Sequence, residues 1–364
     1  MDRIQNELHL YYRVLLTDTF RTVIKISQWF FTAPYPLYPY QHVTSIYQQR
    51  LYVLGKILFS ALVFGAITAA PVLLYFMQDK AIFIYSVPVF IKMMYFIQTT
   101  LNIAGMGYVV FVYQFRTSFH RFYFDRLLHV LEQFGRRDID VGLHQVKRAV
   151  RIVMLLTPVQ IGMVGLMLLL RISDWGQLPR FLTFVAAHIL GRSTTWVYMT
   201  IMGTVAILLR QMNDTLESFI IPPSDAHEAL SAEVPQPTRL TAVDRRMIEK
   251  IRLLQLELMR VVEKINGGEF GTLLIIYIVV TFIYINIELL QLYQGKRQNT
   301  IPSDIFYIRL INCAFRFAGF IMFAYSNRLV QKQNYRVCSI LHQLNKVDNE
   351  AACSNIFADA YKKD

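Results

Sequence analysis

The chain has 364 residues, of which 54% are hydrophobic and only 17% are charged. This composition excludes an ordinary soluble domain and is typical of a polytopic membrane protein. The net charge of +12 would suit a nucleic-acid partner, but the placement of the Lys and Arg residues explains it as membrane topology instead. The three cysteines all lie late in the chain, so no disulfide framework is expected.

Residues 1–50 are predicted to form a cytoplasmic N-terminal segment. An amphipathic stretch from Leu8 to Phe31 precedes residues 33–40, where three prolines stop a helix. We expect this segment to lie at the level of the lipid headgroups, held there by Trp29 and the neighbouring tyrosines.

Six apolar stretches follow, and each is long enough to cross a hydrocarbon core of ~30 Å. They predict a transmembrane helical domain over residues 51–327, with spans at 51–77, 82–113, 152–170, 181–209, 271–293 and 304–327. Segments 114–151 and 210–270 are predicted to lie in the cytoplasm, as is a C-terminal helix at 328–364. The expected fold is therefore an all-α, polytopic membrane helix bundle with long cytoplasmic helical extensions.

The orientation of the bundle follows from its basic residues. Of the 37 Lys and Arg residues, 27 fall in the four segments assigned to the cytoplasm and only 5 in the short loops on the other side. Basic residues in short loops remain on the cytoplasmic side of a membrane. We therefore expect both termini to be cytoplasmic.

The cytoplasmic segments have a helical pattern of their own. Apolar residues recur every three or four positions within 116–134, 247–265 and 329–344, which predicts amphipathic helices that pack on one another. The charged helix at 245–265 is expected to run through Gly267 and Gly268 into the fifth span. Residues 221–241, rich in proline, serine and acids, are predicted to be flexible.

Motifs of catalysis and cofactor binding are absent from the sequence. It contains no metal-ligand cluster, glycine-rich phosphate loop, nucleophile elbow or pair of carboxylates. We therefore expect no enzyme activity, no cofactor and no metal.

Ionisable residues inside the spans are the sharper signal, because each costs several kcal/mol unless it is paired, hydrated or able to snorkel. Lys56, near the inner end of the first span, is expected to snorkel. Glu288 and Arg309 lie at similar depth in two spans joined by a short loop, so they are placed to pair. Two interpretations remain open: an ion pair that joins neighbouring helices, or a water-filled pocket that opens to the outside and binds a small ligand.

The pocket interpretation groups the charged residues with aromatic residues of similar depth. Its candidate ligand-binding residues are Tyr85, Lys92, Tyr95, Phe184, His188, Arg192, Trp196, Tyr284, Glu288, Phe306 and Arg309. Cys313, by contrast, is expected to be a small apolar packing residue.

Three segments carry a resemblance to a known family: residues 205–219, the basic helix VDRRMIEKIRLLQLELMRVVEKIN with residues 268–271 before the fifth span, and SNRLVQKQNYRVCSILHQLNKVDNE after the sixth. Together with the layout of spans, they resemble insect gustatory receptors, members of the insect chemoreceptor superfamily of ligand-gated cation channels. The most specific mark of that family is Thr-Tyr, five apolar residues and Gln-Phe in a seventh, pore-lining span. It is absent here, and the chain is expected to lack that span.

The resemblance implies a multi-pass protein of the plasma membrane with a cytoplasmic N-terminus. It further implies a homo- or hetero-tetramer with related receptor subunits, joined through cytoplasmic helices. A small-molecule tastant bound in an outer-half pocket would open a central cation pore, and the lipid bilayer is the other expected partner.

Three alternatives are weighed against this interpretation. An odorant receptor of the same superfamily shares the topology and the mechanism. A seven-span G-protein-coupled receptor would need an outside N-terminus, which the distribution of basic residues contradicts. A secondary transporter would be expected to show internal repeats, and no two halves of the chain are alike.

Overall fold

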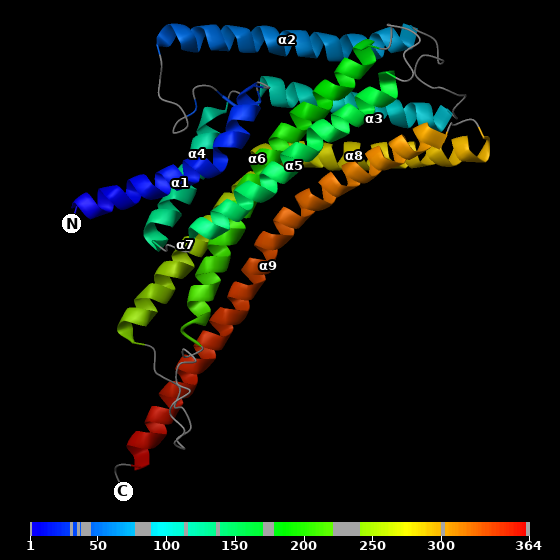
Figure 1. The fold of residues 1–364 in the computed structure, drawn as a ribbon. Helices are drawn as coiled ribbons and strands as arrows, with labels where there is room; N and C mark the ends of the chain where they lie inside the picture. Colours follow the sequence, from blue (N-terminus) through cyan, green and yellow to red (C-terminus); the bar gives the residue numbers. More distant parts are fainter. Residues whose placement is uncertain are drawn as a thin grey trace.

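The computed structural model describes residues 2–29, 32–34, 37, 45–76, 89–112, 116–135, 139–169, 178–220, 241–299 and 303–361. Every regular element within these ranges is an α-helix. The helices are α1 (Asp2–Trp29), α2 (Ile46–Phe76), α3 (Val89–Phe111), α4 (Thr117–Phe134), α5 (Ile139–Leu169), α6 (Leu178–Glu217), α7 (Ala242–Gly267), α8 (Glu269–Arg297) and α9 (Ser303–Tyr361). In Figure 1, α2, α3 and α8 lie across one end of the molecule, and α5, α6 and α9 run from that end toward the other.

The described part of each predicted span is helical. The first three spans fall in α2, α3 and α5, and the last three in α6, α8 and α9. Two helical stretches among the described residues, Phe270–Arg297 and Phe306–Leu344, are long and apolar enough to cross a membrane. Residues 77–88, 170–177 and 221–240 lie outside the described residues, and of the predicted flexible segment 221–241 only Thr241, the N-cap of α7, is described.

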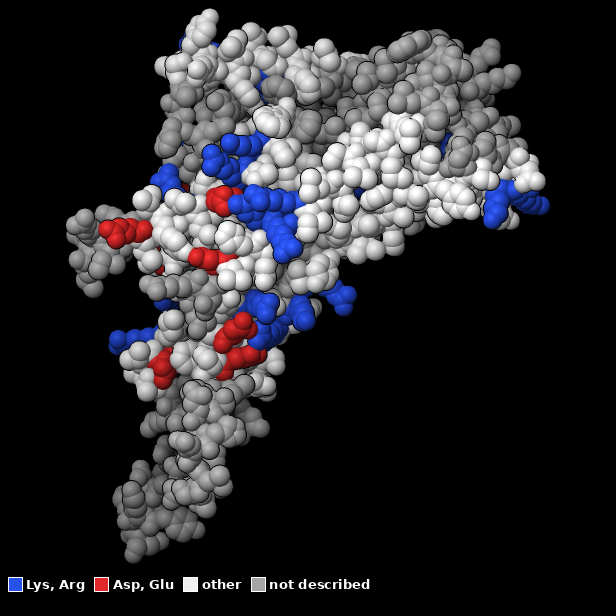
Figure 2. Space-filling view, viewed as in Figure 1, with Lys and Arg blue, Asp and Glu red and all other residues white. Residues whose placement is uncertain are grey.

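The structure divides into an apolar half and a charged half. The apolar half comprises α2, α3, α8 and residues 152–169, 178–196 and 303–327; the charged half comprises α1, α4, α7 and residues 139–151, 197–217 and 328–361. Large apolar side chains are exposed in the apolar half, among them Phe96 at 67% and Phe282 at 68%. Figure 2 shows the charged side chains gathered over the other half, with a further basic group at the far end of α8, whose last turn carries Lys296 and Arg297. Lipid chains would cover such a contiguous apolar surface, which water would not.

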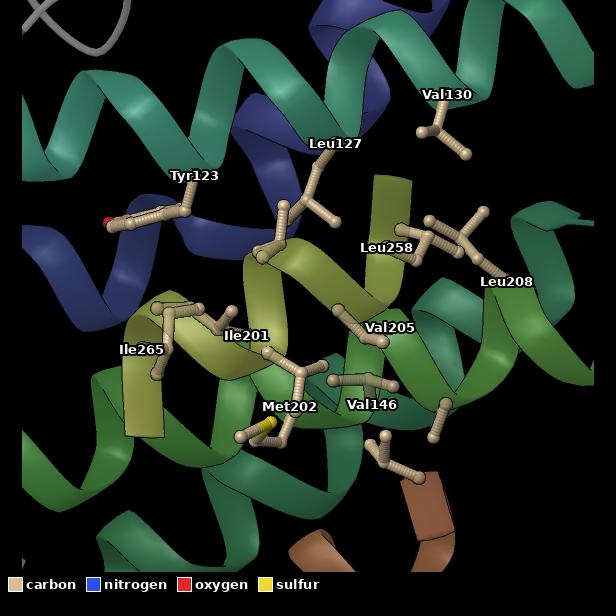
Figure 3. Packing of buried hydrophobic residues seen from close by; sticks show 14 of the residues in the cluster. Tyr123, Leu127, Val130, Val146, Ile201, Met202, Val205, Leu208, Leu258 and Ile265 are labelled. Carbon is tan, nitrogen blue, oxygen red and sulfur yellow. The ribbon is translucent and has the colours of Figure 1, made fainter. Parts of the chain in front are cut away.

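The largest buried core lies mainly in the charged half, extends into the apolar half and is built around α6. This helix packs against α1, α5, α7 and α9. Figure 3 shows the core residues Tyr123, Leu127 and Val130 of α4, Val146 of α5, Ile201, Met202, Val205 and Leu208 of α6, and Leu258 and Ile265 of α7. Ile201, Val205 and Leu208 are fully buried. The amphipathic helices predicted at 116–134 and 247–265 therefore do pack together, and their apolar stripes are what they bury.

One glycine separates α7 from α8. As expected, the charged helix runs through Gly267 and Gly268 directly into the next helix, since α7 ends at Gly267 and α8 begins at Glu269. A Cβ on Gly268 would lie 2.6 Å from the carbonyl oxygen of Lys264, and one on Gly271 would collide with the carbonyl oxygen of Asn266. The chain therefore turns from α7 into α8 within a space that admits no side chain at either position.

α9 is continuous over 59 residues, so the sixth span runs into the charged half without a break. There Arg336 Nη1 lies 2.7 Å from Asp214 Oδ1, and Arg336 Nε donates a hydrogen bond of 2.9 Å to Glu217 Oε1. These three residues form what we call the α6–α9 clamp. The bonds to Glu217 hold the pKa of Arg336 above its ordinary value. Beside the clamp, Asn213 Nδ2 donates to the backbone carbonyl of Gln333 at 2.9 Å.

Two predictions about single residues had opposite outcomes. Cys313 is buried at 4% exposure, as expected of a small packing residue. Lys56 is only 3% exposed, so the prediction that it snorkels into water was wrong. The side chain lies close enough to the buried His120 of α4 for its charge to lower the pKa of that histidine.

Candidate functional site

The predicted contact between the fifth and sixth spans is present. Arg309 of α9 donates from Nη1 to Glu288 Oε2 at 3.3 Å, and the same nitrogen donates to Gln291 Oε1 at 2.9 Å. The side chains of Glu288 and Arg309 are 14% and 12% exposed. Glu288 and Gln291 are three residues apart and therefore share one face of α8. The expected ion pair is confirmed, and a neutral amide extends it.

A second set of contacts continues from this pair into the bundle. Asn312 of α9 donates from Nδ2 to the hydroxyl of Tyr284 at 2.9 Å. Gln160 of α5 in turn donates from Nε2 to Asn312 Oδ1 at 2.8 Å. All three side chains are buried, at 6% exposure or less. Buried amides and hydroxyls need partners of this kind, because an unmade hydrogen bond costs about 1–3 kcal/mol.

Two arginines complete the set. The guanidinium carbon of Arg316 lies 3.6 Å from the ring centroid of Tyr284, a cation–π contact. Arg192 of α6 donates from Nη2 to Gln160 Oε1 at 3.4 Å. Its guanidinium fills a notch at Gly319 of α9, where an added Cβ would lie 2.7 Å from Arg192 Cζ. We call the eight residues Gln160, Arg192, Tyr284, Glu288, Gln291, Arg309, Asn312 and Arg316 the polar network.

The polar network joins four helices within the apolar half. Its members come from α5, α6, α8 and α9, and α6 packs extensively on α9. Described side chains supply three guanidinium groups but a single carboxylate, that of Glu288. Guanidinium groups therefore outnumber carboxylates among the described members of the network, in surroundings where each charge is costly unless it is paired.

The structure brings together only some of the predicted ligand-binding residues. Arg192, Tyr284, Glu288 and Arg309 belong to the polar network, and Trp196, at 4% exposure, lies one turn of α6 beyond Arg192. Tyr85 lies outside the described residues, as do the side chains of Tyr95, Phe184 and His188.

The two remaining candidates, Lys92 and Phe306, have other described neighbours. Lys92 is half-buried on α3. The residue before it, Ile91, packs against Ile287 where α3 contacts α8. Phe306 of α9 contacts Tyr307 edge to face, and the ammonium of Lys296 lies 5.6 Å from the centroid of the Phe306 ring. Lys92 is thus on a helix that packs against the one holding Glu288, and Phe306 is on the same helix as Arg309.

Four members of the network and the notch residue were not predicted: Gln160, Gln291, Asn312, Arg316 and Gly319. A signal for them exists in the sequence. Arg309, Asn312, Arg316 and Gly319 are spaced at three and four residues, so they form one stripe along α9. Tyr284, Glu288 and Gln291 form the matching stripe on α8. Polar stripes on otherwise apolar spans mark the faces that meet inside a bundle.

Comparison with known proteins identifies the family of the chain. The sequence matches the family described as the 7tm chemosensory receptors over residues 20–356, a range that includes every residue of the polar network. No curated protein sequence matches the chain. The match spans far more than half of the chain, and the fold is helical throughout its described part. The protein therefore belongs to the 7tm chemosensory receptor family, in line with its resemblance to insect chemoreceptors.

Proposed function

We propose that the protein is a gustatory-type receptor subunit, a ligand-gated cation channel opened by small-molecule tastants that bind at the polar network. The observation that carries this proposal is the continuous set of hydrogen bonds from Arg192 through Gln160 and Asn312 to Tyr284. These hydrogen bonds join helices that are far apart in sequence. Apolar side chains surround the bonded groups. Family membership gives the chemosensory role, and the network gives a place at which a ligand would act.

The mechanism rests on competition for hydrogen bonds. A tastant with polar groups replaces one contact of the network, and the packing of α9 on α6 and α8 then shifts to a second arrangement. A ligand favours opening only by its difference in affinity for the two arrangements. Because α9 continues into the charged half, a shift at the network reaches the α6–α9 clamp.

The membrane arrangement belongs to the same proposal. We place the chain in the plasma membrane as a multi-pass protein with six spans, a transmembrane domain at 51–327 and cytoplasmic segments at 1–50, 114–151, 210–270 and 328–364. The gathering of charges over one half supports a cytoplasmic position for that half. The subunit assembles as a homo- or hetero-tetramer with related receptor subunits.

Expression in oocytes tests the proposal. The chain is expressed alone and with related subunits, its surface level is measured, and currents are recorded against a panel of sugars, bitter compounds and acids. We expect a cation current evoked by at least one compound and an EC50 raised roughly tenfold by Arg309→Gln, equivalent to about 1.4 kcal/mol. Arg252→Gln, on the exposed face of α7, is the control and should leave the EC50 unchanged. A chain that reaches the surface but gives no current with any partner would contradict the proposal.

The same recordings separate the alternative functions. A current that persists in excised patches without GTP contradicts signalling through a G protein. A reversal potential set by the mixed cation gradients, and not by the tastant gradient, contradicts a transporter. Activation by volatile compounds alone would favour the odorant branch of the superfamily over the gustatory one.

A further inference from the structure

Two buried donors on α6 lack an acceptor within the described part of the chain. Arg192 is 6% exposed and Trp196 is 4% exposed. Neither Arg192 Nε nor Trp196 Nε1 has a hydrogen-bond partner there. The two residues are four apart, so both lie on one face of α6. Buried donors of this kind are rarely left unpaired, so an acceptor from outside the described chain is expected beside them.

The charge of the surroundings decides what kind of acceptor fits. The one carboxylate among the described members of the polar network, that of Glu288, is already bonded to Arg309. Arg192 has only a neutral amide as its described partner, Gln160 Oε1, at the long distance of 3.4 Å. A guanidinium buried against a neutral partner is stabilised most by an anion. Arg192 would repel a cationic ligand, and a neutral ligand would leave its guanidinium with only the neutral amide as its described partner.

The position of Arg192 is fixed by the helix opposite. Its guanidinium lies against Gly319 of α9, and any larger residue there would occupy the space of Nη1 and Cζ. Glycine at this position therefore holds the side chain across the α6–α9 contact. Gly162 of α5, two residues from Gln160, has nothing within 4 Å of an added Cβ and offers a matched control.

We propose that the ligand of this site is an organic acid whose carboxylate accepts hydrogen bonds from Arg192 and from the indole N–H of Trp196. This inference rests on the proposed function and adds the chemical class of the tastant to it. A carboxylate suits the two donors because its two oxygens accept in the plane of one group. The apolar remainder of the acid lies among the apolar side chains of the surrounding helices.

The test measures binding to the purified full-length receptor in lipid nanodiscs. The probes are sodium hexanoate and sodium benzoate, the methyl ester of each, and hexylamine and benzylamine, all at constant ionic strength. Melting temperature reports binding, and the fluorescence of a Trp29→Phe, Trp175→Phe double variant reports on Trp196, since the chain has three tryptophans. We expect the carboxylates to raise Tm, to change the Trp196 emission and to bind at least ~10-fold more tightly than their esters.

Three variants assign the effect to the site. Arg192→Gln should remove the preference of acid over ester while weak binding of the ester remains. Gly319→Ala should lower the affinity for the acid by displacing Arg192, with the charge of the protein unchanged. Gly162→Ala should behave as the wild type. Because Arg192→Gln risks misfolding, the size-exclusion profiles of the variants are compared first. If Arg192→Gln aggregates, the conclusion depends on Gly319→Ala.

The outcomes separate this inference from the proposed function. Three results would each contradict the inference that the ligand is an organic acid. The esters could bind as tightly as the acids, or the preference for acids could survive both Arg192→Gln and Gly319→Ala. The third is an equal rise of the melting temperature with sodium chloride alone. Binding of no probe would overturn it as well. Neutral tastants that evoke currents through a receptor without acid preference would leave the channel function standing and remove only the inference about the ligand.

Discussion

Glu288 of α8 and Arg309 of α9 form an ion pair across the connection between two neighbouring helices, with 3.3 Å between Oε2 and Nη1. Both side chains are largely buried, and the arginine is also bonded to Gln291. Removing one partner of such a pair leaves the other charge uncompensated, which typically costs about 3–5 kcal/mol.

The first prediction is that Glu288→Gln and Arg309→Gln are coupled. Each single variant should lower the melting temperature of the purified receptor, and the double variant should be less destabilised than the sum, with a coupling of about 1–3 kcal/mol. The exposed pair of Glu249 and Arg252 on α7, at 3.5 Å, serves as the control and should show a coupling below about 0.5 kcal/mol. Strict additivity at Glu288 and Arg309 would mean that the two side chains do not meet.

The second prediction concerns the joint between α7 and α8. Gly268→Ala and Gly271→Ala should each destabilise the protein by about 1–3 kcal/mol, because the new methyl groups meet the carbonyl oxygens of Lys264 and Asn266. Gly267→Ala adds a methyl group that has nothing within 4 Å and should be neutral or slightly stabilising. Hydrogen exchange across the joint provides the measurement. Equal exchange in all three variants would show that the joint tolerates side chains.

A third prediction tests the α6–α9 clamp. Arg336→Gln should increase hydrogen exchange at the end of α6 and at the facing part of α9, since it removes the contacts to Asp214 and Glu217. The clamp is partly exposed, so the loss of stability should be near 1 kcal/mol and should shrink at high salt. Lys332→Gln, an exposed position one turn earlier on α9, is the control. Unchanged exchange in Arg336→Gln would rule out a stabilising clamp.

The fourth prediction is a loss of stability in mild acid. His120 of α4 is buried, its Nδ1 lies 3.1 Å from the hydroxyl of Tyr123, and burial, with the nearby charge of Lys56, lowers its pKa from 6.5 to about 3. Between pH 7.5 and 5.5 the unfolded chain takes up a proton at this histidine and the folded chain does not. The free energy of unfolding should therefore fall by about 1.4 kcal/mol over that interval.

Melting curves of the wild type and of His120→Gln at the two pH values measure this contribution. The variant lacks the titrating ring, so its stability should depend less on pH by the same amount. Identical pH profiles would mean that His120 is protonated in the folded protein as readily as in the unfolded chain.

Sequence patterns were sufficient to predict the parts of the structure that depend on local periodicity. The stripe from Met247 to Ile265 predicted α7 because apolar residues recurred at helical spacing, and the buried apolar residues of α7 all come from that stripe. The pairing of Glu288 with Arg309 followed from equal depth and a short connection, since such helices are antiparallel neighbours.

The rest of the candidate site depends on contacts between helices that are distant in sequence. Gln160 joins the network because α5 packs beside α9, and nothing in its own neighbourhood indicates that packing. Gly319 matters only through the side chain of Arg192. Lys56 was expected to snorkel because a single span considered alone leaves such a residue uncovered, whereas in the folded chain it is buried and lies near His120 of α4.

The unbroken length of α9 has a mechanical consequence. Its 59 residues span roughly 88 Å at the helical rise per residue. A tilt of roughly 5° about its middle displaces each end by roughly 4 Å, more than the length of a hydrogen bond. A helix that tilted as one body in this way would act as a lever: a rearrangement of a few tenths of an ångström near its middle would become a movement of whole side chains at its end, and no backbone hydrogen bond of the helix would have to break.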